Sequence, residues 1–161
     1  MKNKLCFFLL CFSLMSIAGC VHTGRLYPVR GPLSAQTPAP VLFAKVHGVT
    51  SGNISVVLIN GEVCQGRWAL VHRAQPAGGG ATASDAANDI SSAWDTVYGP
   101  GFYIANVLGS KFHARALLSG SRGTVMNVEM YLPPDAGEKA GPSAIQGVAQ
   151  DNHDNVYKLA F

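Results

Sequence analysis

The dipeptide Asn60-Gly61 is the feature that most limits how this chain can fold. It separates the run 53–59, in which apolar and polar residues alternate as they do in half-buried strands, from a returning strand over 62–72. Asn-Gly favours the tight type I′ turn, which needs positive φ at both central residues and joins neighbouring antiparallel strands. The pattern therefore predicts a β-hairpin, and with it an antiparallel sheet.

A two-residue turn also fixes the register of this hairpin. It places Val57 opposite Cys64, because the two strands must pair outward from the turn. Trp68 shares a face with Cys64 in the returning strand, which predicts that both side chains lie in the core. Gly66 in the same strand indicates a bulge or close packing.

Turn residues divide most of the remaining chain into further short segments of strand character. With the hairpin, the predicted strands are 41–47, 53–59, 62–72, 102–108, 111–118, 124–132, 144–150 and 156–161. Gly109-Ser110 is typical of a type II′ turn and predicts a hairpin between the fourth and fifth of these strands. The arrangement predicts a mainly β (α+β) fold: an antiparallel β sandwich or partly open barrel of about eight strands with one amphipathic helix.

The helix is expected over 83–98. Thr82 followed by Asp85 matches a capping box, and Gly99-Pro100-Gly101 is a strong stop signal. Apolar residues recur at helical spacing and form one face: Ala83, Ala86, Ala87, Ile90, Ala93, Trp94 and Val97. Trp94 lies at the centre of this face, so it is expected to pack against the sheet and not to stack on a ligand.

The first twenty residues have the layout of a secretory leader. Lys2 and Lys4 precede an uncharged apolar run over 5–18, which is shorter than the roughly twenty residues that a membrane-spanning helix needs. The run ends in Ile17-Ala18-Gly19-Cys20, and this ending resembles the lipobox of bacterial lipoproteins. An ordinary cleaved signal or a signal anchor remains the alternative.

The lipoprotein resemblance covers residues 1–20 only and implies a specific maturation. Cleavage would fall between Gly19 and Cys20, and Cys20 would carry a diacylglyceryl thioether and an acylated amino terminus, which together hold a domain on a membrane. Val21 follows where such proteins carry Asp for retention in the inner membrane, so the outer membrane is favoured in a Gram-negative host. The expected organisation is a signal peptide over 1–19, a lipidated cysteine with a Pro-rich tether over 20–40, and one β-rich domain over 41–161.

The cysteine count leaves a single thiol. Cys6 and Cys11 lie in the leader and Cys20 would be consumed by lipid, so Cys64 alone remains and no disulfide can form within the mature chain. Cys64 is expected to be a small buried hydrophobic residue; a nucleophile or a bridge to another chain are the alternatives.

Composition excludes one broad class of protein and gives no support to a second. Hydrophobic residues make up 48% of the 161 residues and charged residues 13%, which is incompatible with wholesale disorder. Without Lys2 and Lys4, 10 of the 12 Lys and Arg remain against 9 Asp and Glu. This balance does not favour nucleic acid as a partner, because phosphate binding requires a clustered basic face.

No motif in the chain predicts a metal, a cofactor or a catalytic site. The histidines at 22, 47, 72, 113 and 153 lack metal-ligand spacing, and the Asp- and Asn-rich segment 151–155 lacks the Gly and Glu of an EF-hand and is expected to be a turn. In 119–123, a serine replaces the first glycine of a nucleophile elbow, and 78–80 lacks the Lys-Ser/Thr of a phosphate loop. Glu62 is expected to be a solvated residue at a sheet edge.

Function is therefore predicted from the anchor and the fold class. The favoured interpretation is a membrane-anchored envelope lipoprotein that acts as a non-enzymatic structural or interaction module toward an unidentified envelope protein. The alternatives are a small envelope hydrolase built from distant residues, with Cys64, His72 or His113 as candidates, and a lipoprotein inhibitor of a cell-wall-degrading enzyme.

Overall fold

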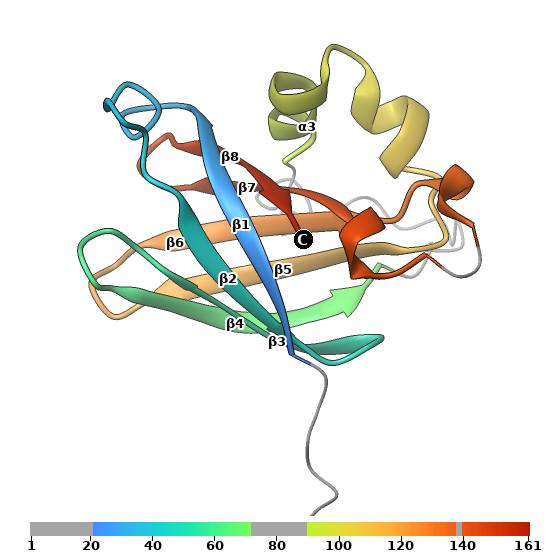
Figure 1. Ribbon diagram of the computed structural model, residues 1–161, viewed down its shortest axis with the longest axis horizontal. Helices are drawn as coiled ribbons and strands as arrows, with labels where there is room; N and C mark the ends of the chain where they lie inside the picture. The colour runs from blue at the N-terminus through green and yellow to red at the C-terminus, as the bar shows by residue number, and fades with distance from the viewer. Residues whose placement is uncertain (1–20, 72–89, 138–139) are drawn as a thin grey trace, which may run out of the picture.

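The computed structural model describes residues 21–71, 90–137 and 140–161. Eight antiparallel strands form a closed barrel in which each strand pairs with its neighbours in sequence and β1 pairs with β8 (Figure 1). The strands are β1 (Val21–Arg30), β2 (Leu42–His47), β3 (Ser51–Val57), β4 (Val63–Leu70), β5 (His113–Gly120), β6 (Val125–Tyr131), β7 (Gln146–Asp151) and β8 (Val156–Ala160). The helical elements are α3 (Ser91–Tyr98), the π-helix η1 (Tyr103–Val107) and the 3₁₀ turns η2 (Pro134–Ala136) and η3 (Pro142–Ala144).

The prediction of a mainly β fold is confirmed, with eight antiparallel strands and one short α-helix in the described residues. Of the two predicted architectures, the sheet takes the barrel, and it is fully closed. Closure removes the two free edges that an open sheet of this size would expose.

About half of the segment expected to be a tether is a strand of the barrel. Residues 21–30 form β1, so the prediction of a tether over 20–40 is wrong there, and the barrel includes residues that precede the predicted domain start at 41. Inward-facing Leu26 is fully buried and closes the barrel between β2 and β8. Pro28 made this segment look unlike a strand in the sequence. In the structure, Pro28 lies where the pairing of β1 with β8 shifts register, which is a position where a sheet tolerates proline.

The strand predicted over 102–108 is helical, so the hairpin predicted around Gly109-Ser110 does not form. The π-helix η1 places Tyr103 and Val107, four residues apart, in the cluster under α3. A short apolar run fits a strand and a buried helical turn equally well, so periodicity could not distinguish them here.

The Asn60-Gly61 hairpin is present, but its turn is one residue longer than predicted. The Leu58 amide donates to the Glu62 carbonyl at 2.8 Å, and the register pairs Val56, not Val57, with Cys64. Gly61 has a φ of 78°. Asn60 does not have the positive φ that a type I′ turn requires, because Asp154 is the one non-glycine residue with positive φ in the described residues. The loop is therefore of the three-residue kind that places glycine in the left-handed region after a type I turn.

Side chains fill the barrel interior. Its buried core combines alanines with bulky residues: Leu26, Leu42, Ala44, Val46, Ile54, Val56, Cys64, Trp68, Ala114, Ala116, Leu118, Met126, Val128, Met130, Ala149, Tyr157 and Leu159. The predicted burial of Cys64 and Trp68 is confirmed, and so is the close approach at Gly66, where an added Cβ would lie 2.1 Å from the Leu117 carbonyl oxygen.

The helix α3 covers the barrel from outside, over β7, β8 and β1 (Figure 1). Trp94 is fully buried there, as predicted, together with Ile90 and Ala93 of the same helical face. The helix ends at Gly99, whose amide donates to the Asp95 carbonyl at 3.0 Å. The predicted helical start over 82–89 lies outside the described residues.

Candidate binding site at the barrel mouth

The two ends of the barrel differ in how they are closed. One end carries the turn at Asn60-Gly61 and the turns over 121–124 and 152–155, whereas the other carries the long connections from β4 to β5 and from β6 to β7 (Figure 1). We call the first the closed end and the second the mouth. Both β1, at Val21, and β8, at Ala160, have a terminus at the mouth.

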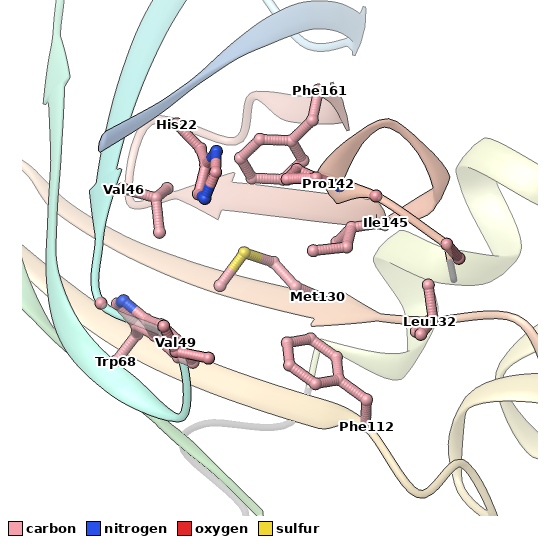
Figure 2. Close-up of a pocket in the computed structure, with 13 residues that line it drawn as sticks. His22, Val46, Val49, Trp68, Phe112, Met130, Leu132, Pro142, Ile145 and Phe161 are labelled. Carbon is pink, nitrogen blue, oxygen red and sulfur yellow. The ribbon is translucent and has the colours of Figure 1, made fainter. Parts of the chain in front are cut away.

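A pocket with a volume of about 220 Å³ opens at the mouth. Figure 2 shows its labelled side chains arranged around that of Met130. They come from strands and connections far apart in the sequence: His22, Val46, Gly48, Val49, Trp68, Phe112, Met130, Leu132, Ala140, Gly141, Pro142, Ile145 and Phe161. Among these residues His22 is the one with a titratable side chain, so the wall is almost wholly apolar.

Trp68 is held in place at this wall. Its indole Nε1–H donates to the His47 carbonyl at 2.8 Å, which satisfies its one polar group at the barrel rim. Its ring contacts that of Phe112, with centroids 6.5 Å apart. The tryptophan therefore presents a fixed apolar surface to the pocket, as aromatic residues do when their polar atom is already bonded.

The closed end is plugged by buried polar groups. Glu62 is 2% exposed; its carboxylate accepts hydrogen bonds from the Arg122 amide at 2.6 Å and the Thr124 hydroxyl at 2.8 Å. Burial opposes ionisation of Glu62, but these hydrogen bonds outweigh it and lower its pKa. The prediction of a solvated edge residue is therefore wrong, because the turn over 121–124 folds over this side chain.

Asp151 forms a second buried group at the same end. Its carboxylate accepts hydrogen bonds from the Tyr157 hydroxyl at 2.7 Å and from the Asn155 amide at 3.0 Å. Burial and the neighbouring Asp151 raise the pKa of Tyr157. Residues 151–155 thus form the predicted turn, and Asp151 serves it as a local hydrogen-bond acceptor.

A third polar cluster lies on the outer face of β5 and β6, beneath α3 and η1. Glu129 is 1% exposed; it accepts a hydrogen bond from Trp94 Nε1 at 2.6 Å and forms an ion pair with Arg115. Arg115 also donates to the Tyr103 hydroxyl at 2.8 Å, and His113 Nε2 lies 3.4 Å from Glu129 Oε1. These contacts tie both helical elements to the barrel wall.

The residues proposed for a hydrolase are not brought together. Cys64 points into the barrel interior, where burial and then the nearby Glu62 and Asp151 raise its pKa to about 11. His113 lies on the outer face instead, and His72 is outside the described residues. Cys64 therefore has the predicted character of a buried small hydrophobic residue.

The remaining sequence candidates are dispersed. His22 lines the mouth, whereas His47 and His153 are exposed on separate elements. In the described residues, no group of three or more His, Cys, Asp and Glu side chains could hold a metal ion. The segment 119–123 connects two strands and not a strand to a helix, as expected. Gly19, Cys20 and 78–80 lie outside the described residues.

Comparison with protein-family models, with curated proteins and with solved structures finds no match to this chain. Within the described ranges, no helix has the length and apolar character needed to cross a bilayer.

Proposed function

We propose that this protein is an envelope lipoprotein, anchored through lipid on Cys20, whose barrel acts as a non-enzymatic binding module with the mouth as its binding end. The observation that carries the proposal is the position of the first described residues. Val21 pairs with His47 and His22 pairs with Val46, so the chain that follows Cys20 enters the barrel at the rim of the pocket. An anchor on Cys20 would then hold the mouth close to the membrane surface.

The character of the pocket supports binding over catalysis. An active site gathers a nucleophile, a base and hydrogen-bond donors around one point. The mouth instead offers Trp68, Phe112, Met130 and Ile145, which suit an apolar group. The outer membrane stays the favoured location in a Gram-negative host.

The anchor is tested by Cys20→Ser in the full chain. We expect this variant to lose incorporation of a labelled fatty acid, because the Cys20 thiol would form the thioether. Cys64→Ala is the matched control and should keep the label, since that thiol is buried in the barrel. Incorporation of the label into Cys20→Ser at the wild-type level would contradict the proposal.

A further inference from the structure

The charges on one side of the barrel are distributed unevenly. Residues 21–71, which form β1 to β4, contain one carboxylate, Glu62, and it is buried at the closed end. The outward-facing Lys45 of β2 and Arg67 of β4 are exposed in the half of these strands nearer the mouth. Lys111, also exposed, precedes β5 at the same end. Asp135, which follows β6 at this end, is also exposed, so the basic side of the mouth is the one formed by β2 and β4.

The size of the pocket limits what can enter it. Its volume of about 220 Å³ exceeds that of an apolar cavity of about 150 Å³ that takes up benzene. It is smaller than the roughly 300 Å³ at which sites for whole drug-sized ligands begin. The pocket thus fits the end of a hydrocarbon chain but not a complete lipid.

Hydrocarbon also matches the chemistry of the wall. The Trp68 indole nitrogen is already bonded to the His47 carbonyl, so the pocket does not need a polar partner there. A chain end would cover apolar surface of Met130, Phe112 and Ile145, with His22 as the one titratable residue of the lining.

We propose that the mouth binds the end of an acyl chain from an anionic phospholipid, with the lipid phosphate near Lys45, Arg67 and Lys111. This inference rests on the proposed anchor, which holds the mouth at the bilayer. Anionic lipid is favoured over a protein partner because the mouth combines a hydrocarbon-sized pocket with basic residues on the outer face of adjoining strands, and basic residues near a bilayer are attracted to anionic headgroups.

The two tryptophans of the chain permit a direct test, because Trp68 lines the pocket and Trp94 is buried under α3. The lipidated full chain is reconstituted in vesicles of phosphatidylglycerol brominated next to the terminal methyl of its acyl chain. Bromine quenches a tryptophan that it contacts. We expect a loss of emission in the wild type that is absent in Trp68→Phe, which retains Trp94 alone.

Two matched variants locate the effect. Gly141→Phe places a ring at the pocket wall, where an added Cβ meets no atom within 4 Å, and should abolish the quenching. Ala35→Phe adds the same ring to the exposed loop between β1 and β2 at the closed end and should leave the quenching unchanged. Circular dichroism confirms that each variant retains the barrel.

The vesicle composition tests the class of lipid. Brominated phosphatidylglycerol should quench Trp68 more than brominated phosphatidylcholine, and Lys45→Glu with Arg67→Glu should remove that difference. Arg30→Glu, at the closed end of β1, is the control for charge reversal. Equal quenching by the two lipids would overturn the assignment of an anionic lipid.

Co-flotation with the vesicles separates the two proposals. Protein that floats with the vesicles while Trp68 stays unquenched would overturn the acyl-chain site and leave the anchor intact. If Trp68 is then shielded from iodide in the wild type but not in Cys20→Ser, the occupant is the protein's own anchor chain. Failure of the wild type to float would overturn the proposed function and this inference with it.

Discussion

Single buried carboxylates join parts of the fold that are far apart in the sequence. Glu62 accepts hydrogen bonds from the Arg122 amide and the Thr124 hydroxyl, and so joins the β3–β4 turn to the β5–β6 turn. Glu129, on the outer face of β6, instead joins α3 to the barrel wall through Trp94 and Arg115. Neither role was visible in the sequence, because the partners of each carboxylate follow only from barrel closure.

The lowered pKa of Glu62 makes a prediction for acid stability. Its folded-state pKa lies below the ordinary value of 4.5, so the ionised side chain stabilises the fold above that pH, and this contribution disappears as the pH falls through the folded-state pKa. Glu62→Gln should therefore lower the melting temperature at neutral pH, and the gap from wild type should narrow below pH 4.5.

Thermal melts across this pH range provide the measurement. Asp135→Asn removes one negative charge from an exposed residue and controls for net charge. A gap between Glu62→Gln and wild type that is constant with pH would contradict the assigned ionised state.

Among the elements, the β3–β4 turn depends on the positive φ of Gly61. Gly61 has φ 78°, and an added Cβ would meet no atom within 4 Å, so a side chain there is opposed by backbone strain alone. We expect Gly61→Val to cost about 1–3 kcal/mol of unfolding free energy. Gly61→Asn should cost less, because asparagine tolerates this conformation better. Denaturant unfolding of the two variants is the measurement, and equal stabilities would contradict the turn assignment.

The packing of α3 depends on Trp94, which is fully buried and donates to Glu129. Trp94→Ala should cost about 3–5 kcal/mol, because it leaves a cavity and deprives a buried carboxylate of a donor. Thr96→Ala, on the exposed face of the same helix, should change stability by less than about 0.5 kcal/mol. In Trp68→Phe, the emission of the remaining Trp94 should be blue-shifted and resistant to quenching by iodide. A red-shifted emission that iodide quenches readily would show that Trp94 is exposed and would contradict this packing.

The elements that could be predicted are those with strong local signals. The hairpin at Asn60-Gly61, the burial of Trp68 and Trp94, and the turn over 151–155 follow from turn chemistry and periodicity. The segment 21–30 was missed because Pro28 and few large apolar residues concealed a strand that is stabilised by pairing with β2 and β8. The pocket was missed for a related reason: His22, Phe112 and Ile145 are far apart in sequence, and barrel closure brings them together.

For the whole molecule, the central claim is that the mouth faces the membrane. The eight residues of β4 span about 26 Å at roughly 3.3 Å per residue, so the two barrel ends are separated by a distance that energy transfer resolves. Val49, 76% exposed at the mouth, and Ala35, exposed in the loop at the closed end, are suitable positions for a fluorophore on an introduced cysteine.

The deciding measurement is energy transfer from each fluorophore to an acceptor on the lipid headgroups, with the lipidated full chain in vesicles. Burial raises the pKa of Cys64 to about 11, so that thiol should not be labelled at neutral pH. Our account predicts more efficient transfer from Val49→Cys than from Ala35→Cys. Equal transfer from both positions, or stronger transfer from Ala35→Cys, would contradict it.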